Sequence, residues 1–471
     1  MRARMFQTIA ITAAVVMAAA ACAEGVAGGP EDVPLRSDTD TDEGSFGFDA
    51  ELSGSLEIMG FGLGDDVATS RYERAEAALG DGVEINLVEG ALDIQQFLTA
   101  VASGNPPDLI IADRDKIGSF ASRGAIMPLA ECIAGEQVAV DDFRTAALEQ
   151  VTFAGEVYGI PEFNSIQVTM ANKDLLDAAN LSIEDVNGSD WAAVTAATEE
   201  LTVEEGSRLS VIGFDSKLPE FLPLWAHSNG VDLISEDGRT AQLDDPAVVE
   251  ALEWAIGIYD AQGGFGTVKA LRDSADFFGA GNQFASDTLG AMPMEQWYLN
   301  VLNDVSPDVS MVFDTVRDQS GEPIAFGAGS AWAIPSGSAN PAAACRFARA
   351  MTELETWLAA AENRISLRES EGGTFTGILT ANEVADEQIR ALVPSTGDEM
   401  WDSAIEAMYA ANDAAFSFPA SAADSEFKTA WTDAVNRVLN GQEEPQVALE
   451  RAQSEAQAAL DEAWADWDES Q

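Results

Sequence analysis

Strand-like and helix-like segments alternate along the chain after residue 50. Three apolar runs predict strands, and the two segments between them have a helical period, with Asp93 as N-cap and Gly104 as the stop signal of the second helix. In chain order these segments are residues 54–63, 66–79, 83–90, 93–104 and 106–115. Strands joined by helices predict a parallel sheet with helices on both faces.

The carboxyl ends of these predicted strands form a candidate binding rim. Ligands of open α/β sheets bind in the crevice beyond the carboxyl ends of the strands. The residues that fall at this edge are Phe61, Gly62, Asp65, Ala112 and Asp113.

The first 22 residues have the layout of a secretory signal peptide. Arginines, an apolar stretch and small alanines precede Cys22, and the stretch is too short for a stable spanning helix. Residues 19–22 resemble a bacterial lipobox, whose cysteine receives a lipid, although a lipobox usually begins with Leu where this chain has Ala19. We expect a lipoprotein signal peptide over residues 1–22 and an anchor at Cys22 on the outer face of the cell membrane. An ordinary signal peptide, cut near Ala21 or Ala23, is the alternative.

Residues 23–50 are rich in Gly, Pro, Asp and Thr and poor in large apolar side chains. Such a segment cannot bury enough surface to offset its chain entropy, so we expect a disordered acidic tether. The remaining residues, 51–471, are numerous enough for two or three domains.

The formal net charge of −57 excludes nucleic acid as a partner and disfavours anionic ligands. An acidic surface of this kind fits an extracellular protein in salty surroundings. Cys132 and Cys345 fit no metal motif; we expect two separate buried thiols, and one disulfide is the alternative that an extracellular location permits. The single histidine, His227, is expected to be structural.

Motifs of catalysis and cofactor binding are absent from the sequence. Neither GxSxG, HExxH nor GxxxxGK[ST] occurs, and the glycine-rich residues 59–66 lack the third glycine of a dinucleotide loop. We therefore expect no enzyme, no catalytic residue, no cofactor and no metal. A surface glycosidase that uses two carboxylates remains the enzymatic alternative.

Five further segments resemble one family, the extracellular solute-binding proteins of ABC importers. The likeness is to the carbohydrate-binding branch, which has the maltose-binding-protein-like fold. The segments are residues 157–176, 288–300, 327–351, 372–389 and 426–460.

This resemblance implies an α/β, two-lobe, periplasmic-binding-protein-like (type II) fold. Each lobe would be a mainly parallel sheet flanked by helices, and the C-terminus would be helical. The first lobe would comprise residues 51–159 and 327–352, and the second residues 161–326 and 353–471. The implied function is that of a monomeric, membrane-tethered protein that captures a carbohydrate in the interlobe cleft and delivers it to ABC permease subunits. The alternative ligand for the same fold is a cation or a peptide.

Candidate ligand contacts follow from sugar chemistry, since aromatic rings cover the C–H faces of a sugar while carboxylates and amides bind its hydroxyls. The resemblance implies that Trp297 is a stacking platform, with Glu295 beside it. Core burial is the alternative for every tryptophan, and a helix N-cap is the alternative for Asp113. The remaining candidates are Trp332, Ser330, Gly329, Glu162, Asn164 and Trp225.

Overall fold

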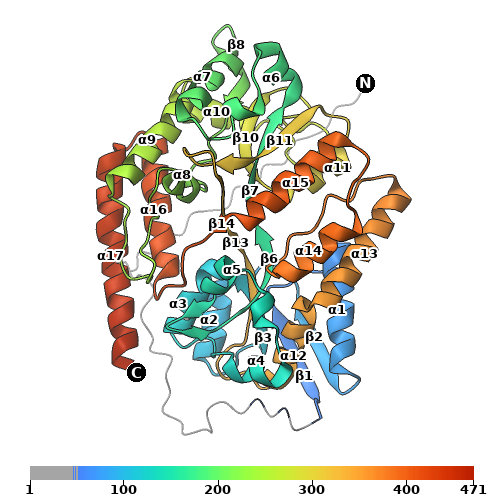
Figure 1. Ribbon diagram of the computed structural model, residues 1–471. Helices are drawn as coiled ribbons and strands as arrows, with labels where there is room; N and C mark the ends of the chain where they lie inside the picture. Colours follow the sequence, from blue (N-terminus) through green and yellow to red (C-terminus); the bar gives the residue numbers. More distant parts are fainter. Residues whose placement is uncertain (1–45, 47, 49–50, 471) are drawn as a thin grey trace, which may run out of the picture. The chain divides into compact units, whose positions relative to one another are not determined.

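The computed structural model describes residues 46, 48 and 51–470, and all of them belong to one structural unit. The predicted signal peptide, Cys22 and most of the predicted tether lie outside the described residues. Two main sheets organise the fold, and helices pack on both (Figure 1). We call the parts of the chain around these sheets the first and the second lobe.

The first lobe contains a five-stranded sheet. The three strands β2, β1 and β3 are parallel to one another, whereas β13 is antiparallel to both of its neighbours, β3 and β6. In spatial order the strands are β2 (Val83–Val88), β1 (Gly54–Met59), β3 (Leu109–Asp113), β13 (Ala328–Ala333) and β6 (Ile160–Ser165).

The second lobe contains a seven-stranded sheet in which antiparallel pairs outnumber parallel ones. In spatial order the strands are β14 (Ala415–Phe416), β12 (Pro323–Phe326), β11 (Met311–Arg317), β7 (Gln167–Asn172), β10 (Leu289–Glu295), β9 (Arg208–Phe214) and β8 (Val203–Glu205). A separate hairpin joins β4 (Thr152–Phe153) to β5 (Glu156–Val157).

The two-lobe α/β fold with a helical C-terminus is confirmed. In the first lobe all strands but β13 run in one direction, as expected, whereas the expectation of a mainly parallel sheet is wrong for the second lobe. The direction of β13 follows from the connectivity between the lobes. The chain crosses from β6 to β7 and returns from β12 to β13, so the returning strand runs against β3 and β6. Strands joined by helices within one lobe, such as β1, β2 and β3, keep the parallel direction.

Helices follow the strands in the predicted order through the first lobe. In both lobes together, the helices before β10 are α1 (Asp66–Leu79), α2 (Ile94–Ala102), α3 (Ile117–Ser122), α4 (Ala130–Glu136), α5 (Thr145–Glu149), α6 (Lys173–Ala179), α7 (Trp191–Leu201), α8 (Leu222–Ser228), α9 (Pro246–Asp260) and α10 (Phe265–Arg272). Those after it are α11 (Tyr298–Val305), α12 (Pro341–Thr352), α13 (Leu354–Glu371), α14 (Glu383–Leu392), α15 (Glu399–Asp413), α16 (Asp424–Leu439) and α17 (Pro445–Ser470). The short 3-10 turns are η1 (Arg114–Lys116), η2 (Val140–Asp142) and η3 (Ile183–Asp185).

Two of the predicted lobe boundaries are corrected by the packing. Residues 161–165 belong to the first lobe, because β6 completes its sheet. Helix α13, assigned from sequence to the second lobe, packs instead on α1 and α12, as the orange and blue helices in Figure 1 show. Its buried Trp357 shares a hydrophobic cluster with Val67 of α1, which is why α13 follows the first lobe. Helices α16 and α17 contact α3 of the first lobe, and α17 also contacts α9 of the second.

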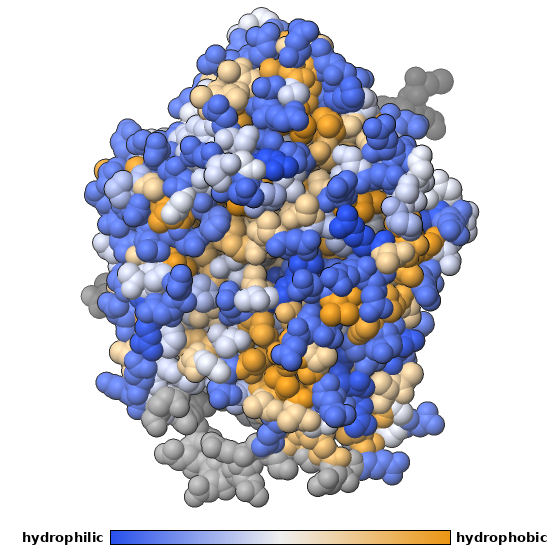
Figure 2. Space-filling model, viewed as in Figure 1, coloured by the Kyte–Doolittle hydropathy of each residue, from blue (hydrophilic) through white to orange (hydrophobic). Residues whose placement is uncertain are grey.

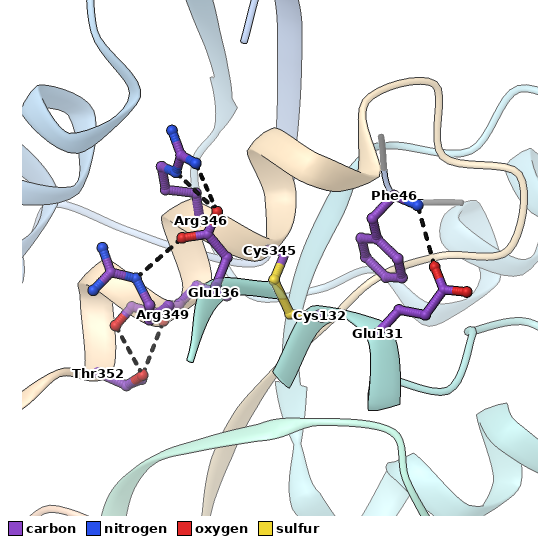
Figure 3. Close-up of a disulfide and its surroundings, with 9 residues drawn as sticks. Phe46, Glu131, Cys132, Glu136, Cys345, Arg346, Arg349 and Thr352 are labelled. Carbon is purple, nitrogen blue, oxygen red and sulfur yellow. Dashed lines mark hydrogen bonds and ion pairs between the residues drawn. A yellow bond between two sulfur atoms is a disulfide. The ribbon is translucent and has the colours of Figure 1, made fainter. Parts of the chain in front are cut away.

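Cys132 of α4 and Cys345 of α12 form a disulfide with Cα atoms 5.6 Å apart, so the expectation of two separate thiols is wrong (Figure 3). Both positions are fully buried on facing helices of the first lobe, which brings the sulfurs together. Two residues of the predicted tether, Phe46 and Phe48, are described, and they lie against this part of the first lobe. Phe46 is buried, its N–H donates to the Glu131 carboxylate at 3.3 Å, and its ring stacks on Phe48.

Hydrophilic residues cover most of the face shown in Figure 2, and hydrophobic residues gather in patches between them. Among residues 46, 48 and 51–470, no helix combines the length and the apolarity that crossing a bilayer requires.

Candidate functional site

A cavity of about 570 Å³ lies beyond the carboxyl ends of β1 and β3. All five residues of the predicted rim line it: Phe61, Gly62, Asp65, Ala112 and Asp113. Of the predicted ligand contacts, Glu162 and Ser330 also line it, so the structure brings these two and Asp113 together. The other lining residues are Gly60, Gly64, Ala68, Arg71, Ala91, Leu92, Ile94, Ile111, Lys116 and Phe163.

Asp113 and Asp65 have different tasks at this edge. Asp65 is the N-cap of α1, since its carboxylate accepts the Ala68 N–H at 2.7 Å. Asp113 precedes η1 but makes no capping hydrogen bond, so its carboxylate is available to the cavity. Desolvation by the surrounding walls raises the pKa of Asp113, and the charge of Asp115 adds to the rise.

The innermost polar group of the cavity is a buried ion pair. Arg71 Nη1 lies 2.5 Å from Glu162 Oε1, with relative exposures of 0% and 1%, and Ser330 Oγ donates to Glu162 Oε2 at 3.1 Å. The Arg71 guanidinium carbon lies 4.6 Å from the Phe163 ring centroid and 4.1 Å from that of Trp357. The rings and the carboxylate offset part of the cost of burying this charge, while Nε and Nη2 have no hydrogen-bond partner among the described residues.

Asn164 and Gly329 do not line the cavity; they hold the crossing strands together. Asn164 Oδ1 accepts from Arg114 Nη2 at 2.8 Å, and its Nδ2 donates to Asn412 Oδ1 at 2.9 Å. Gly329 has φ of +153°, and a Cβ there would lie 2.0 Å from the Phe163 carbonyl oxygen. Because these groups are occupied by the protein itself, their predicted role as ligand contacts is replaced by a positioning role.

Glu295 and Trp297 belong to the second lobe and lie outside the lining of this cavity. Both side chains are half-buried at the end of β10. Between them, Gln296 accepts the Ile166 N–H and donates to the Asn164 carbonyl oxygen, each at 2.9 Å, which ties this turn to the first crossing. Desolvation by burial raises the pKa of Glu295, and the negative charge of Glu220 adds to the rise. A hydrogen bond from the backbone N–H of Glu295 itself and the positive charge of Lys217 oppose it.

Two of the predicted tryptophans are core residues, so their assignment as ligand contacts is wrong. Trp332 is 0% exposed and packs against Phe61 and Phe347. Trp225 is 1% exposed, and its indole N–H donates to the Ser216 carbonyl oxygen at 2.8 Å. Both side chains are enclosed by the protein, where a large ring gains most from burial.

His227 has the expected structural role. Its Nδ1 lies 2.8 Å from Asp232 Oδ1, and its ring stacks on Phe416 with centroids 3.6 Å apart. Within the part of the chain that the structure describes, no three His, Cys, Asp or Glu side chains are grouped as a metal site would require.

Sequence reasoning missed several residues of the site. Arg71 sits in an acidic helical stretch, where a cation looks like a solvent-exposed charge. The signal available was its rarity, because the chain has only 24 Lys and Arg residues among 471. Leu92 and Ile94 follow β2, and Lys116 follows β3, so applying the topological argument to the end of β2 and a few residues beyond β3 would have found them.

Residues 71–370, more than half of the chain, match the model of one family, described as bacterial extracellular solute-binding protein. The chain belongs to this family. A relative in Streptococcus pneumoniae strain R6, a maltooligosaccharide ABC transporter solute-binding lipoprotein, is 24% identical over 261 residues, which are 52% of this chain and 55% of the relative. The chain thus spans about half the length of the curated relatives it matches.

Solved structures of solute-binding proteins share the fold. CpMnBP1 with mannobiose bound superposes with a TM-score of 0.68 and 20% identity, over 85% of this chain and 99% of that one. An ABC transporter solute-binding protein from Thermotoga lettingae, bound with α-D-tagatose, gives a TM-score of 0.66 and 20% identity, over 87% and 100%. At these identities the likeness establishes the fold.

Proposed function

We propose that this protein is a membrane-tethered solute-binding protein that captures a carbohydrate between its two lobes and delivers it, unaltered, to an ABC importer. The observation that carries the proposal is the composition of the cavity in a chain of this family. Apolar side chains, Phe61, Leu92 and Ile94, line it together with the carboxylate of Asp113, while Glu162 lines it with its carboxylate already bonded to Arg71 and Ser330. A sugar has apolar C–H faces and a rim of hydroxyls, and this mixture complements both.

The second lobe supplies the opposing contacts in this proposal. Trp297 offers an indole face, and Glu295 offers a carboxylate two residues away at the end of β10. A ligand that touches both lobes favours the closed arrangement by the free energy of the contacts made only there. The relatives support a carbohydrate ligand, since the one from S. pneumoniae is described as a maltooligosaccharide ABC transporter solute-binding lipoprotein and CpMnBP1 has mannobiose bound.

The test is calorimetry and thermal shift with the purified protein and a panel of neutral sugars, including glucose, maltose, maltotriose, mannobiose and mannotriose. Trp297→Ala should weaken binding by a few kcal/mol, roughly the loss of a buried aromatic anchor. Trp467→Ala, a half-buried indole of α17, is the matched control and should leave the affinity unchanged. Equal affinities of the two variants would contradict the proposed site.

Two separate experiments test whether the protein binds sugar without hydrolysing it and whether it is attached to the membrane. Release of reducing ends from any bound oligosaccharide by the pure protein would contradict a receptor and favour a glycosidase. Cys22→Ser should release the protein into the medium or leave it unprocessed in cells. Continued membrane attachment of this variant would contradict the lipid anchor.

A further inference from the structure

The predicted tether, residues 23–50, contains two aromatic side chains in a segment that is otherwise rich in Gly, Pro, Asp and Thr. They are Phe46 and Phe48, which stand two positions apart. Neither side chain is left in solvent, since Phe46 is 6% exposed and Phe48 is half-buried. A flexible tether gains nothing from large apolar rings, so their burial on the folded body needs a physical reason.

The two rings lie together against α4. The Phe46 N–H donates to Glu131 Oε2 at 3.3 Å, beside the disulfide (Figure 3). The rings of Phe46 and Phe48 stack with centroids 5.4 Å apart and planes 4° from parallel. Phe46 belongs to the same buried hydrophobic cluster as Cys132, and Phe48 packs against that cluster. A specific hydrogen bond and a stacked pair of rings therefore dock this part of the tether.

Gly135 of α4 leaves room for the second ring. A Cβ at this position would lie 2.3 Å from Cε2 and 2.4 Å from Cδ2 of Phe48, far inside van der Waals contact. The Phe48 ring thus occupies the space into which a side chain at position 135 would project. Because the three nearest atoms all belong to this ring and none to the backbone, a side chain here would displace the ring and leave α4 in place.

Helix α4 is fixed by contacts that do not involve the tether. Cys132 is joined to Cys345 of α12. The Glu136 carboxylate, at the end of α4, pairs with Arg346 Nη2 at 2.8 Å and with Arg349 Nε at 3.3 Å (Figure 3). One covalent bond and two ion pairs thus hold α4 on α12, so the two rings meet a surface of fixed shape.

The contacts of the two rings flank Cys132 along the helix. Glu131 directly precedes Cys132, and Gly135 follows it by three positions, which makes the two residues neighbours on the helix surface. Cys132 and Cys345 are both 0% exposed. Reduction requires a thiolate to attack one sulfur, form a mixed disulfide and displace the other sulfur as a thiolate, so it is slow where neither sulfur can be reached.

We propose that Phe46 and Phe48 form a clip that docks the tether on α4 and keeps external thiols from the Cys132–Cys345 disulfide. Glu131 and the open side of Gly135 are the docking surface for this clip. The tether then leaves the first lobe at a fixed point next to the disulfide. This inference goes beyond sugar capture and does not depend on it, so the failure of one leaves the other standing.

Two aromatic rings in a tether would also suit insertion into a membrane surface. Docking on α4 is favoured because the Phe46 N–H and the Phe48 ring each have a specific place there. The residues just before them, 38–43, include four acids and no base, and an anionic lipid surface repels such a segment. Rings that are as accessible in the unchanged protein as in the variants below are the outcome expected for the membrane alternative.

Chymotrypsin, which cleaves after accessible phenylalanines, tests the docking on the purified protein with its tether. The rate of the cuts after Phe46 and Phe48, followed by mass spectrometry, reports how often the clip opens. Gly135→Ala should raise this rate by about tenfold or more, because the added methyl group and the Phe48 ring cannot share one place. Since alanine favours a helix over glycine, this loss of protection cannot come from a weaker α4.

Gly257→Ala is the matched control. Gly257 is likewise an exposed helical position, on α9, but a Cβ there would meet no atom of the described residues within 4 Å. Its cuts after Phe46 and Phe48 should be as slow as those of the unchanged protein. Equal rates in the Gly135→Ala and Gly257→Ala variants would overturn the docking.

Reduction by dithiothreitol in native buffer, followed by alkylation and mass spectrometry, tests the shielding. Gly135→Ala and Phe46→Ser/Phe48→Ser should each lose the disulfide about tenfold faster than the unchanged protein. Gly135→Ala added to Phe46→Ser/Phe48→Ser should have no further effect, because the ring that it displaces is already gone. Faster cleavage without faster reduction would overturn the shielding. Additive effects of the two changes would overturn the clip, because Gly135→Ala would then act through α4 itself.

Discussion

Replacing Arg71 with methionine should be among the most destabilising single changes in the first lobe. The substitution leaves the Glu162 carboxylate 1% exposed, with the Ser330 hydroxyl as its remaining side-chain donor. Removing one member of a buried pair costs about 3–5 kcal/mol, because the other charge stays desolvated. Methionine retains the packing against Phe163 and Trp357 but loses the cation–π contacts, which adds about 1 kcal/mol. We expect a loss of about 4–6 kcal/mol.

Urea unfolding of the purified protein, followed by circular dichroism, measures this loss. Lys173→Met is the matched control: its pair with Asp177 is exposed at 51% and 61%, and its removal should cost less than about 1 kcal/mol. The double variant Arg71→Met/Glu162→Leu should recover a large part of the stability, giving a coupling energy of about 2 kcal/mol or more. The reasoning is refuted if Arg71→Met costs no more than Lys173→Met, or if the double variant is additive.

Two further predictions concern the disulfide and the pH dependence of binding. Cys132→Ser/Cys345→Ser should lower the free energy of unfolding by about 2–5 kcal/mol in the same urea assay, since the bridge closes a loop of 213 residues; an unchanged midpoint would mean that the bond does not form. Burial raises the pKa of Glu295 and of Asp113, so on acidification the sugar affinity should begin to fall at a pH above the ordinary carboxyl pKa of about 4. The contribution of these two groups to folding stability has the opposite dependence, since it is lost as the pH rises through their raised pKa. Calorimetry from pH 4 to 7 checks the sign, Glu295→Gln should flatten the profile, and an unchanged affinity across this range would contradict it.

Local sequence rules correctly predicted those features of the fold that depend on a few neighbouring residues. Asp93 caps α2 and accepts the Gln96 N–H, as expected from residue preferences at helix starts. The rim at β1 and β3 followed from topology alone, since it depends only on where parallel strands end. These features were predictable because each depends on a few neighbouring residues.

Long-range pairing explains what the sequence left open. Arg71 and Glu162 are 91 positions apart, and nothing in either neighbourhood marks the partner. Trp332, Trp225 and Trp297 have the same side chain, yet only Trp297 lies at a strand end that remains partly open. Trp332 lies on a strand and Trp225 on a helix whose neighbouring residues are also apolar, so the local sequence pattern does not distinguish these core tryptophans from Trp297.

One residue next to the cavity also fixes the strands that cross between the lobes. Arg114 follows Asp113, and its Nη2 donates to Asn164 Oδ1 at 2.8 Å and to the Ala328 carbonyl oxygen at 2.5 Å. Its Nε donates to Gln150 Oε1 at 2.8 Å, within the first lobe. The guanidinium therefore joins β6 and β13 to the end of β3, and Glu162 and Ser330 on these strands keep a fixed position relative to Asp113. A ligand that bonds these groups meets a spacing set by folding, so less conformational entropy is lost when it binds.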